Sequence, residues 1–155
     1  NSSQSIFAVK YVNGEMTGWT EDSYSQFSAS ELINFVNGDA PKYVSRGLIE
    51  GFDQSIVSSG KSARLLIMDF ATDDNALNMF NFKANDNTSK IKAGDNYDLN
   101  TAQLNTSAAD APEAYAHFGQ YFLELRLDGF SDPAEGQKAA TNLVELLDSK
   151  ISQMK

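Results

Sequence analysis

Residues 119–127 read Gly-Gln-Tyr-Phe-Leu-Glu-Leu-Arg-Leu and carry the clearest strand pattern of the chain. Large apolar side chains stand at every second position, which is the repeat of a β-strand with one buried face. These residues are Tyr121, Leu123, Leu125 and Leu127. The Gly119-Gln120 pair before them suits a two-residue turn with glycine at its first central position. We therefore expect residues 114–118 to pair with 121–125 as a β-hairpin.

A long amphipathic helix is predicted after this strand. Asp132-Pro133-Ala134-Glu135 supplies an N-cap residue, a first-turn proline and an acidic residue in the first turn. Apolar residues then recur at helical spacing, namely Ala140, Leu143, Val144, Leu147, Ile151 and Met154. Such a stripe must be buried, so we expect this helix to lie on the sheet.

Two shorter helices are predicted in the first half of the chain. Residues 28–31, Ser-Ala-Ser-Glu, form a capping box that begins the first helix at Ser28. Asn37-Gly38 is predicted to end it, with Gly38 in the left-handed conformation of a C-terminal cap. The second helix is expected from Thr72 to about Phe82. Its predicted apolar stripe consists of Ala76, Leu77 and Phe80, with Met79 beside it.

The remaining elements are predicted from shorter patterns. Residues 6–12 alternate as a strand, and the polar segment 15–25 is expected to be a loop. Residues 43–57 indicate a strand broken at a glycine, and residues 58–61 indicate a turn. Residues 63–70 are apolar on both faces, which is typical of a strand in the middle of a sheet.

This order of elements predicts an α+β fold. Because the connections are short, we expect a single antiparallel sheet, with the long C-terminal helix and one or two shorter helices packed on one of its faces. With 155 residues, the chain is expected to form a single domain, 1–155, with residues 1–5 disordered.

Composition excludes several classes of function. A net charge of -9 disfavours nucleic acid as a partner, because an acidic surface repels phosphates. The apolar runs fall far short of the ~20 residues that a transmembrane helix needs. The absence of cysteine excludes disulfides and thiolate chemistry.

Three candidate chemical motifs have simpler explanations. Gly60-Lys61-Ser62 is similar to the end of a phosphate-binding loop but lacks the earlier glycine, so we interpret it as a turn. His117, the single histidine, is expected to be an ordinary strand residue and not a metal ligand or catalytic base. Asp86, Asp95 and Asp98 do not fit the spacing of a calcium loop, which leaves weak calcium binding or a solvated loop as alternatives.

A further pattern resembles a known family. Leu32–Ala40, Leu-Ile-Asn-Phe-Val-Asn-Gly-Asp-Ala, followed by Tyr43 and Gly47-Leu48, resembles an uncharacterised bacterial family of exported, lipoprotein-like domains. That family carries a helix-ending Ile/Val-Asn-Gly-x-Ala motif. Asp39 departs from it, because the family usually has a small residue there. The resemblance covers roughly residues 18–150 and implies an exported or lipid-anchored protein without an assigned activity.

The predicted ligand-binding residues are Trp19, Asn37, Asp39 and Tyr43. Amphipathic aromatic residues near loops can line a binding cleft or can close the open edge of the sheet. Asn37 has a structural role as the end of a helix, or it lines a pocket mouth with Asp39 and Tyr43. The sequence predicts no catalytic residue, metal ligand or cofactor.

Three hypotheses of function follow. The first is a non-enzymatic binding module, exported to the periplasm, the envelope or the outside, for a small molecule or an envelope protein. The polar start Asn1–Ser5, without Met, favours removal of a leader; the alternative is a boundary inside a larger cytosolic protein. The second is a carboxylate-dependent hydrolase that uses Asp39 and Asp69 with Tyr43 nearby. The third is a structural or assembly protein. The oligomeric state is left open.

Overall fold

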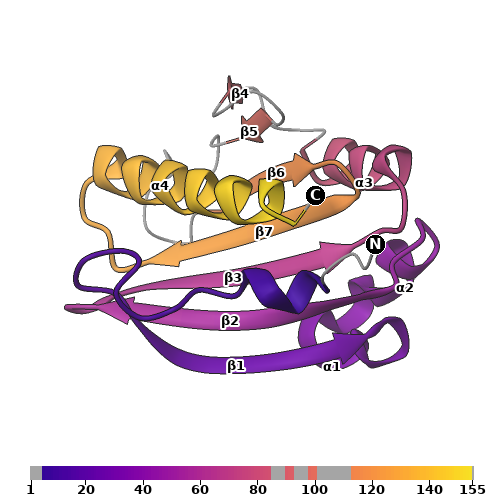
Figure 1. Cartoon of the computed structure of the whole chain (residues 1–155), viewed down its shortest axis with the longest axis horizontal. Coiled ribbons are helices and arrows are strands. Elements are labelled where there is room, and N and C mark those ends of the chain that lie inside the picture. The colour runs from indigo at the N-terminus through magenta and orange to yellow at the C-terminus, as the bar shows by residue number, and fades with distance from the viewer. Residues whose placement is uncertain (1–4, 85–89, 93–97, 101–112, 155) are drawn as a thin grey trace.

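A computed structural model describes residues 5–84, 90–92, 98–100 and 113–154. Within these ranges, seven antiparallel strands form one sheet in the order β1-β2-β3-β7-β6-β5-β4 (Figure 1). The strands are β1 (Thr20–Ser28), β2 (Glu50–Ser58), β3 (Lys61–Asp69), β4 (Lys90–Lys92), β5 (Asp98–Asn100), β6 (Glu113–Phe118) and β7 (Tyr121–Asp128). The helical segments are η1 (Ile6–Val9), η2 (Ala29–Glu31), α1 (Ile33–Val36), η3 (Asn37–Asp39), α2 (Ala40–Val44), α3 (Asp73–Ala84) and α4 (Pro133–Ser152). The predicted α+β class with a single antiparallel sheet is confirmed.

The two predicted turns form hairpins. β6 and β7 are joined through Gly119 and Gln120, with Phe118 paired to Tyr121, and Gly119 has a φ of +56°. The β2–β3 turn holds Ser59 and Gly60, both with positive φ, which is the conformation that matches the twist of a tight hairpin. The Gly60-Lys61-Ser62 segment is therefore a turn that enters a strand.

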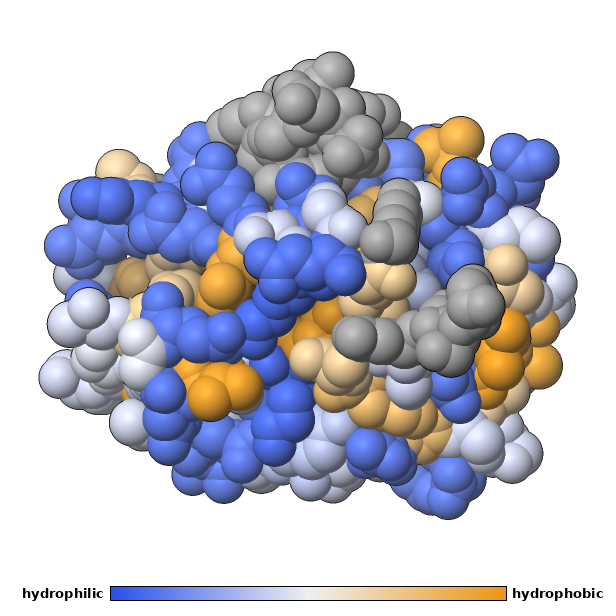
Figure 2. Space-filling view, in the orientation of Figure 1, coloured by the Kyte–Doolittle hydropathy of each residue, from blue (hydrophilic) through white to orange (hydrophobic). Residues whose placement is uncertain are grey.

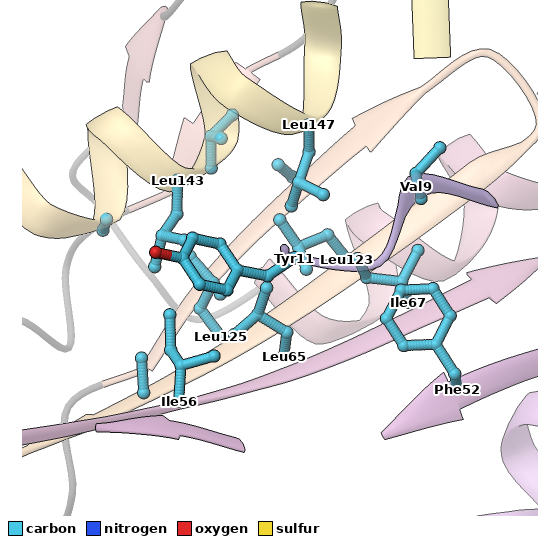
Figure 3. Packing of buried hydrophobic residues seen from close by; sticks show 14 of the residues in the cluster. Val9, Tyr11, Phe52, Ile56, Leu65, Ile67, Leu123, Leu125, Leu143 and Leu147 are labelled. Atoms are coloured by element: carbon cyan, nitrogen blue, oxygen red, sulfur yellow. The ribbon is translucent and has the colours of Figure 1, made fainter. Parts of the chain in front are cut away.

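Helix α4 covers one face of the sheet, as its pattern predicts. The Asp132 side chain accepts a hydrogen bond from the Ala134 N–H and caps the helix, which runs for 20 residues. Its buried stripe consists of Ala140, Leu143, Val144, Leu147 and Ile151. Figure 3 shows Leu143 and Leu147 facing the strands, with the ring of Tyr11 between α4 and the sheet. Each large apolar side chain buried in this way contributes about 1.5–3 kcal/mol.

The expectation that all helices share one face is wrong. Leu66 and Met68 of β3 and Phe122 of β7 point to the face opposite α4, where they pack with α2 and α3. β3 is apolar on both faces, and β7 adds Phe122 to the second face, so both faces need a cover. Within α3, Ala76, Met79 and Phe80 are buried, whereas Leu77 of the predicted stripe is 41% exposed. The remaining buried members of this cluster are Phe27, Leu32, Ala40, Tyr43, Leu48, Phe70 and Tyr115.

The first helical region extends past its predicted end. The predicted capping box is present, with the Glu31 carboxylate accepting the Ser28 N–H at 2.9 Å. Gly38 does not have a positive φ, and helical turns continue through η3 and α2 to Val44. Pro41 does not stop this run because it occupies the first turn of α2, where proline is tolerated. Gly47, with a φ of +101°, follows α2, and β2 begins only at Glu50 instead of residue 43.

The N-terminal segment also differs from its prediction. Residues 6–9 form the 3-10 helix η1 and not a strand; the Ser5 side chain caps the Phe7 N–H, and Ile6 and Val9 pack into the core under α4. Ile6 and Val9, three residues apart, are the buried pair, whereas Phe7 is half-buried. Ser5 is thus part of the fold, and the rest of the predicted disordered start, 1–4, lies outside the described residues.

Strand β1 begins inside the predicted loop 15–25 and continues to Ser28. It is the first strand of the sheet order and pairs only with β2. Of its nine residues only Phe27 is buried. An edge strand with polar residues on both faces shows no apolar alternation, so its sequence resembles a loop.

Candidate functional site

Residues 8–19 run beside α4 on the same face of the sheet, and a buried glutamine fixes them there. Gln54 of β2 is 0% exposed. Its Oε1 accepts the Tyr11 N–H at 2.8 Å, and its Nε2 donates to the Tyr11 carbonyl at 2.9 Å. The same Nε2 donates to Glu21 Oε1 at 2.8 Å. The side-chain amide thus satisfies a stretch of backbone that has no strand neighbour.

The Tyr11 side chain shapes the loop that follows it. Its hydroxyl lies 2.8 Å from the Trp19 carbonyl and 3.0 Å from the Met16 carbonyl, and it accepts the Met16 N–H at 3.1 Å. Tyr11 itself is 1% exposed. The loop between Tyr11 and Trp19 is therefore held in shape by hydrogen bonds to the Tyr11 hydroxyl.

Lys150 joins this loop to α4. Its Nζ donates to the Lys10 carbonyl at 2.7 Å and to Glu15 Oε1 at 2.5 Å. Glu15 Oε1 also accepts the Val12 N–H at 2.7 Å. The Lys150 side chain is 16% exposed, so this ion pair is shielded from water more than an ordinary surface pair.

Two adjoining hollows lie between the loop and the helix. One has a volume of about 460 Å³ and is lined by Glu15, Met16, Thr17, Trp19, Asn142, Glu145 and Leu146. The other has a volume of about 440 Å³ and is lined by Ala8, Val9, Val12, Glu15, Leu146, Ser149, Lys150, Gln153 and Met154. Glu15 and Leu146 border both. We call the two hollows together the α4 groove. Figure 2 shows that the face bearing α4 is hydrophilic over most of its area, with small hydrophobic areas between.

Two polar groups in the α4 groove lack partners. Trp19 is 9% exposed, yet its indole N–H makes no hydrogen bond with any residue that the structure describes. Glu145 lies on the exposed side of α4 and forms no ion pair or hydrogen bond within the same ranges. Buried donors are almost always satisfied, so an indole N–H without a partner in the described ranges is available to a water or ligand oxygen in the hollow.

The four residues predicted to bind a ligand do not lie together. Trp19 packs on the face of α4, where its ring stacks on Phe130 with centroids 6.2 Å apart. Tyr43 lies in the cluster on the opposite face. Asp39 is exposed and pairs with Lys42 at 3.3 Å. Asn37 belongs to η3.

Tyr43 is buried in a polar contact that ties α2 to the sheet. Its hydroxyl donates to Glu124 of β7, and Lys83 of α3 lies 3.8 Å from the same carboxylate. Lys83 Nζ also lies 5.7 Å from the ring centres of Tyr43 and Tyr115. Burial, together with the Glu124 carboxylate, raises the pKa of Tyr43 above its ordinary value of 10.0. The phenol is thus neutral and acts as a hydrogen-bond donor.

The carboxylates of the hydrolase hypothesis face different sides of the sheet. Asp69 follows the alternation of Leu65 and Ile67, which point toward α4, whereas Asp39 neighbours Tyr43 on the other face. Asp69 Oδ1 is held by the Ala71 N–H and by Gln120 Nε2, both at 2.8 Å. Acid–base partners must reach one substrate, so this pair cannot serve as one.

The structure places some of the other chemical candidates. The His117 ring packs against Phe80, with ring centres 4.8 Å apart. No cluster of three or more potential metal ligands occurs among the described side chains. Of the calcium candidates, Asp86 and Asp95 lie outside the described residues, and Asp98 begins β5.

The α4 groove was not predicted from the sequence, although one signal for it exists. Its helical wall consists of Asn142, Glu145, Leu146, Ser149, Lys150 and Gln153, which repeat at helical spacing beside the buried stripe. A second stripe of mixed polarity next to an apolar one is the pattern of a helix face that borders a groove. The partner wall lies more than a hundred residues earlier, as the Lys10–Lys150 contact shows.

No protein-family model matches this chain, and no curated protein matches it. A solved structure with a similar fold is the extracellular domain of PknH from Mycobacterium tuberculosis, with a TM-score of 0.55 and 12% sequence identity. The match covers 94% of this chain and 96% of that one. At this identity the similarity concerns the fold. In the parts of the chain that the structure describes, no helix combines the length and hydrophobicity needed to cross a bilayer.

Proposed function

We propose that this chain is a non-enzymatic, exported binding module of bacteria whose ligand site is the α4 groove. The observation that carries the proposal is the unpartnered indole N–H of the nearly buried Trp19 at the edge of a hollow of about 460 Å³. A hollow of that size is in the range of sites that bind small molecules or short segments.

The groove is built to hold a fixed shape. Gln54 and Lys150 attach the loop to the sheet and to α4 through hydrogen bonds of 2.9 Å or less. A site whose walls are already ordered loses little entropy when a ligand binds. The arrangement therefore favours binding to a preformed surface over closure of a lid.

Binding without catalysis is supported by the chemistry of the lining. Glu15 is held by Lys150 and by the Val12 N–H, which leaves Glu145 as the carboxylate of the groove without a partner. General acid–base catalysis would need a second titratable group directed at the same atoms. The other titratable groups of the lining, Glu15 and Lys150, form an ion pair with each other, which favours binding over acid–base catalysis.

Export is supported by two likenesses. Leu32–Ala40 resembles a family of exported, lipoprotein-like domains, and the PknH domain with a similar fold is extracellular. A periplasmic, lipid-anchored or extracellular location would follow. Fractionation of the native host with an antibody to this chain tests that location, and recovery in the cytosol alone would refute it.

The binding proposal is tested with the single tryptophan of the chain. Its indole cross-peak in an ¹H–¹⁵N spectrum reports on the groove while three probes are added in turn: a hexapeptide of alternating lysine and alanine, a neutral hexasaccharide and a long-chain fatty acid. We expect at least one probe to shift this signal and to be recovered unchanged. Recovery of a cleaved probe would refute a purely binding role.

Matched variants locate the site. Asn142→Phe fills the hollow beside Trp19 and Ser149→Phe fills the other, whereas Ser152→Phe changes an exposed residue of α4 that lines neither. We expect the first two substitutions to weaken binding about ten-fold or more and the third to leave it unchanged. Equal binding by all three variants, or no shift with any probe, would show that the groove is not the site.

A further inference from the structure

We propose that the α4 groove binds a peptide in extended conformation that carries lysine or arginine side chains. This inference rests on the proposed function and adds the chemical class of the ligand. Four features of the groove support it: its length, the indole donor, the covered indole face and the uncompensated carboxylate.

The groove is long rather than round. Its helical wall extends from Asn142 to Gln153, and at 1.5 Å per residue this stretch is about 16 Å long. An extended chain advances about 3.3 Å per residue, so about five residues would fill the groove. The two hollows, which meet at Glu15 and Leu146, suit successive side chains better than one compact molecule.

The donor at the edge of the groove favours an oxygen acceptor on the ligand. The Trp19 indole N–H is nearly buried and lacks a partner among the described residues. A backbone carbonyl is a strong acceptor that every peptide carries, and its hydrogen bond would remove the cost of leaving this donor unpaired. A ligand with such an acceptor is therefore favoured over one without it.

The aromatic ring disfavours a carbohydrate. Sugar rings are held by flat stacking on an open aromatic face, but the Trp19 ring is 9% exposed and stacks on Phe130 with an interplanar angle of 19°. This geometry favours a ligand bound through hydrogen bonds and charge.

The charges of the groove favour a cation. Lys150 already donates to the Lys10 carbonyl and to Glu15, so it offers little to an anionic ligand. Glu145 has no partner in the described ranges and can pair with a lysine or arginine of the ligand. The net charge of -9 attracts cationic ligands to the whole surface and increases their association rate.

The experiment compares three hexameric probes on the intact chain. The lysine–alanine hexapeptide is expected to shift the Trp19 indole signal, whereas the glutamate–alanine hexapeptide and the neutral hexasaccharide are not. Titration calorimetry then compares Glu145→Gln with the control Glu135→Gln, which removes the same charge at the other end of α4. We expect Glu145→Gln to weaken binding of the lysine probe about two- to five-fold, as for an exposed ion pair, and Glu135→Gln to change it less.

The outcomes distinguish a failure of the proposed ligand class from a failure of the proposed binding function. If the hexasaccharide or the glutamate probe shifts the indole signal as strongly, and Asn142→Phe abolishes that shift, the groove remains a binding site and the peptide proposal is overturned. If both glutamate substitutions weaken binding of the lysine probe equally, the attraction is a general effect of the negative net charge, and the role of Glu145 is refuted. If none of the probes shifts the signal, both proposals fail.

Discussion

The contact most open to a quantitative test is the buried amide of Gln54. In Gln54→Leu, the side chain keeps a similar size, but the Tyr11 N–H and carbonyl lose the partners that now lie 2.8 and 2.9 Å away. Each buried backbone group left unpaired costs about 1–3 kcal/mol. Leucine recovers part of that loss because no polar side chain has to be desolvated, so we expect the free energy of unfolding to fall by about 3 kcal/mol. For a chain of this size the melting temperature would fall by roughly 10 °C.

Urea unfolding followed by Trp19 fluorescence measures this loss, since Trp19 lies in the segment that Gln54 fixes. Gln26→Leu is the matched control, because Gln26 is exposed on β1 and its side chain donates to the Tyr24 hydroxyl at 3.0 Å. We expect that change to stay within about 0.5 kcal/mol of the parent chain. A loss below about 1 kcal/mol for Gln54→Leu, or one equal to that of the control, would refute the assignment of Gln54 as the anchor of residues 8–19.

A related substitution gives a pH signature. Gln54→Glu places a buried carboxyl group beside Glu21, whose oxygen now accepts the Gln54 amide at 2.8 Å. Burial and the neighbouring carboxylate both raise the pKa of such a group. Its folded-state pKa then exceeds the unfolded value, so stability is full at acid pH and is lost as pH rises through the folded pKa. We expect the variant to approach the parent below about pH 4 and to differ most near pH 7; a constant difference would contradict the buried position.

Two further changes test the opposite face and the close contact of β2 with β3. Tyr43→Phe removes the donor to Glu124 and should cost about 1–2 kcal/mol in urea unfolding. The raised pKa of Tyr43 makes the parent chain lose stability as the pH rises above 10.0, the pKa of the phenol in the unfolded chain. The variant should therefore lose less stability than the parent between neutral pH and pH 11. Identical alkaline profiles would argue against the buried phenol. Gly51→Ala would bring its Cβ into collision with the Ile67 carbonyl oxygen, and we expect a loss of about 3 kcal/mol or more. Gly38→Ala meets nothing within 4 Å and should be neutral or stabilising by up to about 1 kcal/mol. Equal effects of the two glycine substitutions on the melting temperature would refute the contact at Gly51.

The elements that the sequence determined are those whose signal is local. The alternation from Tyr121 to Leu127, the glycine turn before it and the N-cap at Asp132 each depend on residues within a few positions of one another. The capping box at Ser28 belongs to the same group. Period-two and helical repeats record which side of an element is buried, so these elements and the α+β class could be predicted.

The tertiary structure decided which side of the sheet each element covers and where a site could form. Trp19 and Tyr43 have similar loop-end patterns, yet packing places them on opposite faces, because strands with two apolar faces recruit helices to both. The edge strand β1 forms by pairing with β2. The helix η1 is held by packing under α4 and by the hydrogen bonds of Gln54 to Tyr11 just after it. The residues of β1 and η1 do not by themselves reveal these neighbours. The groove unites residues 8–19 with the last turns of α4, and no local pattern encodes a contact across 140 positions.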